Sequence, residues 1–585
     1  MKRLFAIALV ALICSCSTKK NGSSFPSPIF ITSDSTQTPT YEENISFWEQ
    51  AKKSSNQISM FEIGQSDAGK PIHLITWSKE GIKNWEYIRS DARSVLFINN
   101  GIHPGEPDGI DACQLLIKEI VETPALQDKY KDCIIALIPV YNVGGALNRN
   151  SHSRANQEGP AAYGFRGNAQ NLDLNRDCIK MDSKNSFALA QAFHYLDPDL
   201  FFDTHVSNGA DYQHVISLLE TQAQKLGGPL ESFYKTEITD VLFKKMKEND
   251  GYDMIPYVNV WGRAPQDGGI YQFMDWPRYT NGLAALHHVP AYTIETHMLK
   301  PFKDRVLATL SLLKNAADLL SEKGKNVQDV RSQQKEYYAN TEEHQYHWEI
   351  DSSKYEEIKF LGYDYRELPS TLNSKFKQAT YNQDYPLDTI IPFYNHYKGS
   401  KSALKPRAFI IPAGYYQVAE RLAAHGVSFK RIEEDTVVMV RKAKIASYET
   451  SPNAYEKHYP HYNTVLSWTE GEETILAGSY CFATGTEKDR ILMETLLPDA
   501  IDSFFSWNFF DAILQQKEGY SPYVWDIKAA ELLSQYPDLK KRFEEKLEED
   551  SGFKSNLSAQ QYWVYQNSMH AEKAYLDYPV RFLLP

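Results

Sequence analysis

The sequence predicts an α/β protein whose larger domain contains a mixed β-sheet with helices on both faces. The short apolar runs at 94–99 and 133–141 have the length and composition of buried strands. Between them, apolar residues recur at helical spacing from Ile110 to Val121. Strands that alternate with helices in this way are typical of sheets covered on both sides.

The same alternation extends over residues 46–323, which we interpret as one domain. Residues 58–77 predict two strands around the turn at Asp67–Gly69, and further short strands are expected at 200–204 and 291–296. Residues 302–323 predict a helix that closes the domain. The polar stretch 324–345 follows it and marks the expected boundary.

Residues 346–585 differ in pattern and predict a second, α+β region whose role the sequence does not define. Strands are expected at 355–365 and 435–441, and residues 407–431 predict strand, helix and strand with turns at Gly414 and Gly426. A solvated helix is expected at 538–550, where lysines precede glutamates by four residues. We call residues 346–585 the accessory region.

Composition excludes several classes of protein. The 585 residues carry a net charge of −13, which is unfavourable for a general nucleic-acid binder. Hydrophobic residues make up 42% and charged residues 23%, so wholesale disorder is excluded. Beyond the leader, four cysteines (Cys113, Cys133, Cys178 and Cys481) lack the close spacing of a structural zinc site, and we expect free thiols.

The first residues predict a lipoprotein leader. Lys2 and Arg3 precede a short apolar stretch, and Ile13-Cys14-Ser15-Cys16 resembles a bacterial lipobox with a small residue before the cysteine to be lipidated. We therefore expect a signal peptide at 1–16, a lipid anchor on Cys16 and a flexible tether at 17–45. This places the protein at a bacterial cell envelope, facing the periplasm or cell surface. A plain secretory signal is the alternative.

Candidate metal ligands follow two of the expected strands. His103 and Glu106 lie three residues apart in the turn after the strand 94–99, and His205 ends the strand that begins at residue 200. Imidazole and carboxylate groups together suit zinc. Loops after the carboxyl ends of strands are where open α/β sheets place their sites. Taken alone, a histidine at a strand end is more often structural.

Further polar residues are candidates for the same site. Asp173, in the run Asn171–Arg176, is a candidate to orient a ligand histidine, and Arg176 has the fork geometry that binds a carboxylate. Glu295 closes the apolar strand 291–295 and is a candidate general base. The alternatives are a polar loop for the run and a salt-bridged edge carboxylate for Glu295.

This ordered set resembles the zinc metallocarboxypeptidase family related to carboxypeptidase A, in the form of a long bacterial lipoprotein-type member. The resemblance covers about residues 60–300, including IGQSDAGKPI and NNGIHPGEPDG. The matching residues, in family order, are His103, Glu106, Arg154, Asp173, Asn175, Arg176, His205 and Glu295. It implies a zinc carboxypeptidase-like fold for residues 46–323.

The resemblance also implies roles for these residues. One Zn²⁺ per chain would be held by His103, Glu106 and His205, with Glu295 as the base and Arg154 polarising the scissile carbonyl. Asn175 and Arg176 would bind the free C-terminal carboxylate of a peptide substrate. Arg149 and Arg166 are alternatives to Arg154. The family's mobile tyrosine is assigned to Tyr271, with Tyr257 and Tyr279 as alternatives.

The sequence thus favours a zinc-dependent metallocarboxypeptidase attached to the membrane through a lipid. A zinc amidohydrolase that acts on acylated amino acids or cell-wall peptides is the alternative, because related deacylases share the ligand framework. A binding protein with a decayed site is a third possibility, which the intact Glu295 disfavours.

The lipobox leads to the first prediction. Cys16→Ser removes the thiol that would be lipidated, so we expect the protein to move from the membrane fraction to the soluble fraction. Cell fractionation followed by immunoblotting measures this, with Cys14→Ser as the matched control. Membrane association that survives Cys16→Ser would contradict the lipid anchor.

Overall fold

The structure, a computed structural model, describes residues 24–584, so Cys16 lies outside the described residues. Within that range, eight strands form a mixed sheet in the order β1-β2-β4-β3-β5-β9-β6-β7. In the order of the chain, these strands are β1 (Ile58–Gln65), β2 (Pro71–Trp77), β3 (Ser94–Asn99), β4 (Cys133–Ile138), β5 (Leu200–Ser207), β6 (Ile216–Glu220), β7 (Ile255–Pro256) and β9 (Ala291–His297).

The centre of this sheet is parallel and buried. Strands β4, β3, β5 and β9 pair in parallel, whereas β1, β2 and β6 join the sheet through antiparallel pairs. Every residue of β3 and β4 is buried, as their continuous apolar runs predict. The predicted mixed sheet with flanking helices is therefore confirmed.

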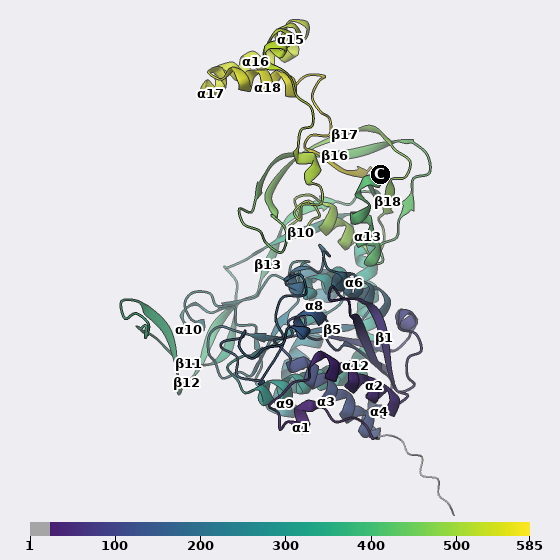
Figure 1. The fold of residues 1–585 in the computed structure, drawn as a ribbon, viewed down its shortest axis with the longest axis vertical. Coiled ribbons are helices and arrows are strands. Elements are labelled where there is room, and N and C mark those ends of the chain that lie inside the picture. Colours follow the sequence, from purple (N-terminus) through teal and green to yellow (C-terminus); the bar gives the residue numbers. More distant parts are fainter. Residues whose placement is uncertain (1–23, 585) are drawn as a thin grey trace, which may run out of the picture.

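Helices cover both faces of the sheet (Figure 1). One core contains side chains of α2 (Tyr41–Ser54), α3 (Asp108–Glu122), α9 (Asp240–Asp250) and α12 (Phe302–Asn340). The core on the opposite face contains side chains of α6 (Lys184–Leu196) and α11 (Thr280–Leu286). Shorter helices in the connections are α4 (Pro124–Lys129), α5 (Val143–Leu147), α7 (Ala223–Leu226), α8 (Gly228–Phe233) and α10 (Pro265–Gly268).

The closing helix is longer than predicted. The expected end at residue 323 is wrong, because α12 continues through the polar stretch to Asn340. Two polar residues of this stretch, Arg331 and Gln334, are buried and paired, and they hold the end of the helix against the domain. Arg331 is 4% exposed and forms ion pairs with Asp197 at 2.6 Å and Asp199 at 2.9 Å. Gln334 donates to the carbonyl oxygens of Leu226 and Gly227. The polar composition of residues 324–340 therefore does not mark a domain boundary, because these residues continue the helix.

The described part of the predicted tether is also ordered. The prediction of a flexible segment up to residue 45 is wrong for residues 24–45, which include α1 (Ile29–Thr32) and the start of α2. Phe30 is buried against Phe302, with ring centroids 5.7 Å apart. The hydroxyl of Thr38 donates to Asp111 at 2.5 Å. These side chains anchor a segment whose overall composition is polar.

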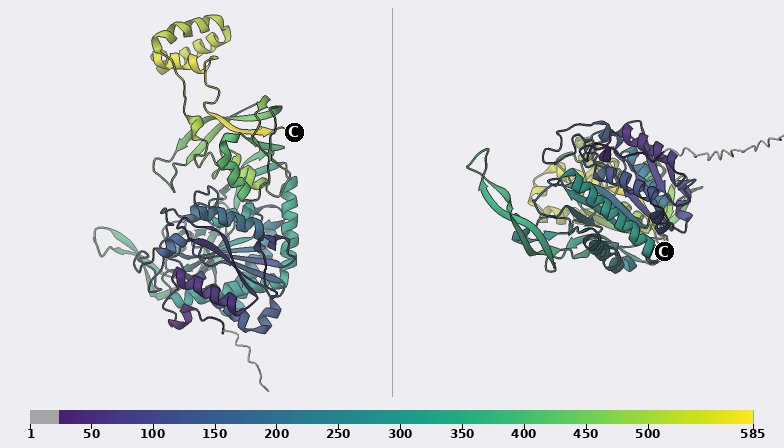
Figure 2. Two further views of the ribbon diagram at one scale, coloured as in Figure 1. Left: turned by 45° about the vertical axis from the view of Figure 1, so that its right-hand side comes forward. Right: turned by 90° about the horizontal axis from the view of Figure 1, so that it is seen from below.

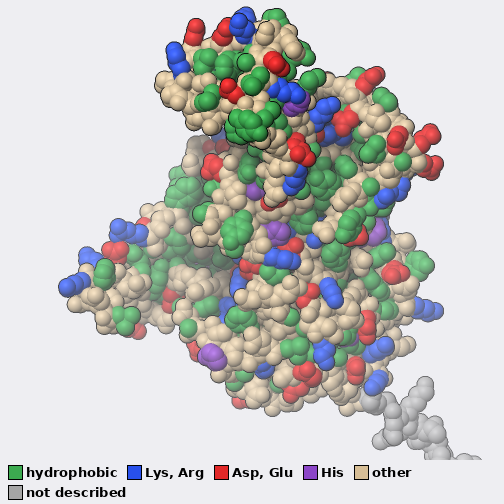
Figure 3. Space-filling model, turned by 45° about the horizontal axis from the view of Figure 1, so that its top comes forward, with side chains coloured by type: hydrophobic (Ala, Val, Ile, Leu, Met, Phe, Trp, Pro, Cys, Tyr) green, Lys and Arg blue, Asp and Glu red, His purple; other side chains and the backbone are tan. Residues whose placement is uncertain are grey.

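The accessory region combines a two-stranded pair, a long hairpin and a second sheet. Strands β10 (Glu343–Ile350) and β13 (Tyr397–Leu404) pair with each other, and β11 (Glu356–Pro369) with β12 (Lys377–Tyr394) forms an arm that projects from the body (Figures 2 and 3). The second sheet has the order β15-β18-β14-β19-β16-β17. Its strands are β14 (Ala408–Ile411), β15 (Lys430–Arg431), β16 (Thr436–Thr450), β17 (His461–Ile475), β18 (Tyr480–Ala483) and β19 (Asp577–Leu583).

Helices complete the accessory region. The predicted strand, helix and strand at 407–431 are confirmed as β14, α13 (Tyr416–Ala424) and β15, and α14 (Asp489–Leu496) packs in the same core. The predicted helix at 538–550 is α16 (Pro537–Glu549). Together with α15 (Pro522–Gln535), α17 (Ser551–Lys554) and α18 (Leu557–Gln566), it forms a separate lobe (Figures 1 and 2).

Two further observations bear on the sequence predictions. Cys113, Cys133 and Cys178 are buried free thiols, and Cys481 is a half-buried one, as expected. Among residues 24–584, no helix combines the length and apolarity that crossing a membrane requires.

The buried ion pairs of α12 lead to the second prediction. Arg331→Ala leaves the buried carboxylate of Asp199 without its cation, whereas Asp197 keeps its ion pair with Lys335, so we expect a loss of about 3 kcal/mol in the free energy of unfolding. Lys325→Ala, at an exposed position of the same helix, is the control and should change it by less than about 0.5 kcal/mol. Denaturant titration of the full chain measures both. Equal stability of the two variants would contradict a structural role for the end of α12.

Candidate functional site

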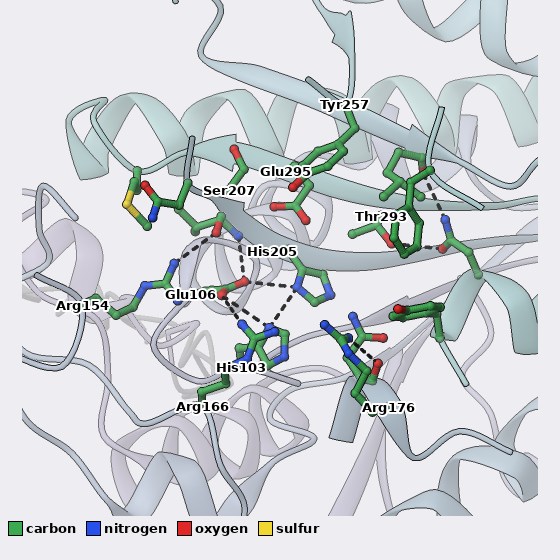
Figure 4. A pocket seen from close by; sticks show the side chains of 18 of the residues that line it. His103, Glu106, Arg154, Arg166, Arg176, His205, Ser207, Tyr257, Thr293 and Glu295 are labelled. Carbon is green, nitrogen blue, oxygen red and sulfur yellow. Dashed lines mark hydrogen bonds and ion pairs between the residues drawn. The ribbon is translucent and has the colours of Figure 1, made fainter. Parts of the chain in front are cut away.

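Three strands of the central sheet end at one edge and bring the predicted residues together. Asn99 at the end of β3 pairs with Asp203 of β5, and the turn that carries His103 follows β3. His205 of β5 pairs directly with Glu295 of β9 in parallel register. Because side chains of paired residues project to the same face, His205 and Glu295 lie side by side (Figure 4).

His103, Glu106 and His205 form a compact group of possible metal ligands. The Nδ1 atoms of the two histidines lie 3.1 Å apart, Oε1 of Glu106 lies 3.4 Å from His103 Nδ1, and Oε2 lies 3.1 Å from His205 Nδ1. Ligand atoms about 2.0–2.1 Å from a tetrahedral zinc ion lie about 3.3 Å from one another. The donor set and its spacing therefore fit zinc.

Positive groups keep Glu106 in the charged form that a metal requires. Although burial raises its pKa, Arg154 and then His103 hold the pKa of Glu106 well below its ordinary value. Arg154 Nη1 donates to Glu106 Oε1 at 2.7 Å, and the backbone N–H of Val206 donates to Oε2 at 2.9 Å. A Cβ atom at Gly105 would lie 2.7 Å from the Arg154 side chain, so glycine permits this close approach.

Each histidine is oriented from behind by a carboxylate. His103 Nε2 donates to Asp173 Oδ1 at 2.9 Å, and His205 Nε2 donates to Asp203 Oδ2 at 2.9 Å. These contacts leave the Nδ1 atoms to face the metal position, an arrangement common around ligand histidines. The structure thus places Asp173 where the sequence predicted.

Asp203 was not identified from the sequence as the carboxylate that orients His205. The signal was present, because Asp203 precedes His205 by two residues on the same strand and so shares its face. The hydroxyl of Thr280 also donates to Asp203 Oδ2, at 2.8 Å.

Glu295 is the carboxylate beside the group of ligands. Burial raises its pKa to about 8; the nearby His205 works in the opposite direction, and Glu106 adds to the rise. A divalent cation at the ligand group would favour the charged form of Glu295, because an opposite charge stabilises a carboxylate.

A cavity of about 570 Å³ opens over these residues. Its volume is in the range of ligand pockets of proteins. Besides His103, Glu106, His205 and Glu295, its lining includes Arg154, Arg166, Asn175, Arg176, Tyr257 and Tyr279. Three guanidinium groups thus surround one cavity, which favours an anionic ligand.

The three candidates for a carbonyl-polarising arginine differ in position. Arg154 and Arg166 line the cavity, and Arg166 also donates from Nε to Asp173 Oδ2 at 3.0 Å. Arg149 instead donates to the carbonyl oxygens of Thr38 and Pro39. The geometry therefore leaves Arg154 and Arg166 as the candidates.

A short 3₁₀ turn, η2 (Leu174–Arg176), presents Asn175 and Arg176 to the cavity. Asp173 precedes the turn, and its Oδ1 accepts from the backbone N–H of Asn175 at 2.9 Å. The Arg176 guanidinium lies over the ring of Tyr279, 4.8 Å from its centroid. The stacked ring and a hydrogen bond from Arg176 Nη1 to the carbonyl oxygen of Asn175, at 2.6 Å, limit the conformations of the guanidinium at the cavity wall.

Tyr271 does not occupy the position predicted for the tyrosine of the cavity. It lies on β8 (Ile270–Tyr271), which pairs with β12 of the arm, and its ring packs edge-on against Trp261. Tyr257 and Tyr279 line the cavity instead. The three tyrosines are close in sequence, and only the path of the loop distinguishes them.

Comparison with known proteins agrees with this geometry. Residues 45–212 match the family model described as zinc carboxypeptidase. A curated protein named carboxypeptidase 2, from Trichophyton rubrum, is 20% identical over 519 residues, covering 83% of this chain and 88% of the relative. The corresponding protein of Trichophyton equinum is also 20% identical, with the same coverage.

Solved structures include similar proteins. The metallo-carboxypeptidase from Burkholderia cenocepacia is 17% identical, with a TM-score of 0.36, over 49% of this chain and 70% of that chain. The metallo-carboxypeptidase from Pseudomonas aeruginosa is 16% identical, with a TM-score of 0.37, over 49% and 69%. The family match contains His103, Glu106, Asp173 and His205, so residues 45–212 of this chain are similar to a zinc carboxypeptidase domain at the positions of the ligand group.

Proposed function

We propose that this protein is a zinc-dependent metallocarboxypeptidase that removes residues from the free C-terminal end of peptides. The observation that carries the proposal is the pairing of His205 with Glu295 beside a ligand group that fits zinc, in the same cavity as Arg176. A metal site, a base and a carboxylate-binding cation are the three groups that such a reaction requires.

The ligand group and Glu295 have complementary tasks. His103, Glu106 and His205 would hold one zinc ion, which supplies a Lewis acid and lowers the pKa of a water molecule. Glu295 accepts a proton from the attacking water and returns it to the leaving amine. Arg154, beside Glu106, stabilises the negative charge that develops on the carbonyl oxygen, and Arg166 adds positive charge to the same wall.

The carboxylate end of the substrate is assigned to Asn175 and Arg176. Both line the cavity from η2, and Arg176 is fixed by the Tyr279 ring beneath it. A guanidinium pairs with a carboxylate through two parallel hydrogen bonds, so it distinguishes a chain end from an internal peptide bond. Tyr257, which lines the same cavity, is assigned to contact the substrate.

We further propose that the protein acts at a bacterial cell envelope. The leader that ends at Cys16 supports a lipid anchor on the N-terminal side of the catalytic domain. The substrates would be peptides available on that side of the membrane.

The third prediction separates the metal from the base. Glu295→Gln keeps the size of the side chain but removes the proton acceptor, so we expect zinc to stay bound while kcat falls about a hundredfold or more. His205→Ala removes one of three ligands, and both zinc and activity should be lost. Metal analysis by mass spectrometry and peptide hydrolysis assays measure these changes, with the exposed Glu336→Gln as control. Near-normal turnover of Glu295→Gln would show that another group is the base.

The fourth prediction distinguishes a carboxypeptidase from a deacylase. Amidation of the substrate's C-terminus removes the charge that Arg176 binds, so we expect cleavage to slow about a hundredfold. Arg176→Ala should cause a similar loss on the free peptide and little further loss on the amidated one. Paired rate measurements on the two peptides check this, with Lys184→Ala, on the exposed start of α6, as control.

Equal cleavage of free and amidated peptides by the unmodified protein would exclude the carboxypeptidase. It would favour the zinc amidohydrolase, which shares the ligand group but does not need a terminal carboxylate.

A further inference from the structure

A turn of the accessory region reaches the site from behind. The turn Tyr455–His458 lies between β16 and β17 and is closed by backbone hydrogen bonds in both directions, of 2.7 and 3.0 Å. At its tip, Glu456 Oε2 accepts from the backbone N–H of Asp173 at 2.8 Å. Asp173 is the carboxylate that orients His103. A residue 283 positions away in the sequence thus contacts the residue behind a metal ligand.

The backbone of this turn is strained in order to present Glu456. Both central residues are left-handed, with φ of 48° at Glu456 and 76° at Lys457. Tight hairpin turns of this kind favour Asn-Gly, and a non-glycine residue held in this conformation is strained. Glycine at residue 456 would remove the strain at that residue but would also remove the carboxylate that Asp173 contacts.

The accessory region also contacts the segment that begins at Asp173 near its other end, at residues 180–182. His458 Nε2 donates to Asp182 Oδ2 at 2.7 Å, and Arg421 donates to the carbonyl oxygens of Lys180 and Met181 at 2.7 and 3.1 Å. Ile179 is fully buried in the core of the accessory region. Residues 173–182 are therefore fixed at both ends by side chains that lie more than 230 residues later.

The accessory region also contacts the residue next to Tyr279, whose ring lies against Arg176. Arg278, next to Tyr279, donates from its backbone and from Nε to Asp502, at 2.8 Å in both cases. Its guanidinium lies 4.9 Å from the ring centroid of Trp507. The accessory region thus contacts the backbone on both sides of the cavity wall that carries Arg176.

We propose that Glu456 is a positioning residue of the zinc site, and that the accessory region completes the catalytic domain. The carboxylate satisfies the N–H of Asp173, which fixes the start of η2 and keeps the Asp173 carboxylate between His103 and Arg166. A charge-assisted hydrogen bond is about twice as strong as a neutral one, which suits this task. The inference rests on the proposed function, because it assigns Glu456 to the same metal site.

The test compares variants of one turn in the full-length protein. Glu456→Ala and Glu456→Gly both remove the acceptor, and the glycine variant also relieves the backbone strain, so it keeps the test valid if the alanine variant folds poorly. Glu456→Gln retains a neutral acceptor. Lys457→Ala changes the neighbouring, exposed residue of the same turn and is the matched control.

The primary measurement is zinc affinity, by competition with a chromophoric chelator. Loss of a group behind a ligand histidine typically lowers metal affinity about 10–100-fold, and we expect about tenfold for Glu456→Ala and Glu456→Gly. Glu456→Gln should lie within about threefold of the unmodified protein, and Lys457→Ala should equal it. At saturating zinc, kcat for a free peptide should follow the same order.

Two outcomes would overturn the inference. If Glu456→Gly binds zinc and turns over like the unmodified protein, Glu456 does not position the site. If Glu456→Ala lowers only the melting temperature, the turn has a purely structural role. Absence of zinc binding by the unmodified protein would instead overturn the proposed function itself, which separates the two failures.

Discussion

The parallel pairing of β5 with β9 determines the geometry of the whole site. It places His205 and Glu295 at one level of adjacent strands, so the ligand and the base come from the most rigid part of the fold. The turn after β3 then has to bring only His103 and Glu106 to the same edge. Because parallel strands end together, one sheet edge collects groups that lie almost 200 residues apart in the sequence.

Charge balance explains the polar residues around this edge. The carboxylates of Glu106, Asp173 and Asp203 are buried within hydrogen-bonding distance of two imidazoles and two guanidiniums. Buried charges are tolerated when they are paired and hydrogen-bonded, and a dication would fit among these oxygens and nitrogens. Glu295 differs from these carboxylates: burial raises its pKa, His205 opposes the rise, and the nearby charge of Glu106 adds to it.

Much of the fold and of the ligand group was predictable because both depend on local pattern. Apolar runs identified β3, β4, β5 and β9, and residue order identified His103, Glu106 and His205. Long-range contacts were not predictable. The polar sequence around Arg331 does not reveal its buried ion pairs with Asp197 and Asp199. Likewise, the sequence around Glu456 does not reveal its hydrogen bond with Asp173. Tyr271 and Tyr257 could not be ranked, because loop path, rather than composition, decides which tyrosine reaches the cavity.

The position of β19 in the accessory sheet has a consequence for biosynthesis. β19 begins only at Asp577, yet it lies in the middle of the sheet, between β14 and β16. The sheet therefore stays open on the ribosome until residue 583 has emerged, long after the catalytic strands have been made. Since β16 leads into the turn that carries Glu456, the support of the segment around Asp173 depends on a strand that is made about 400 residues later in the chain.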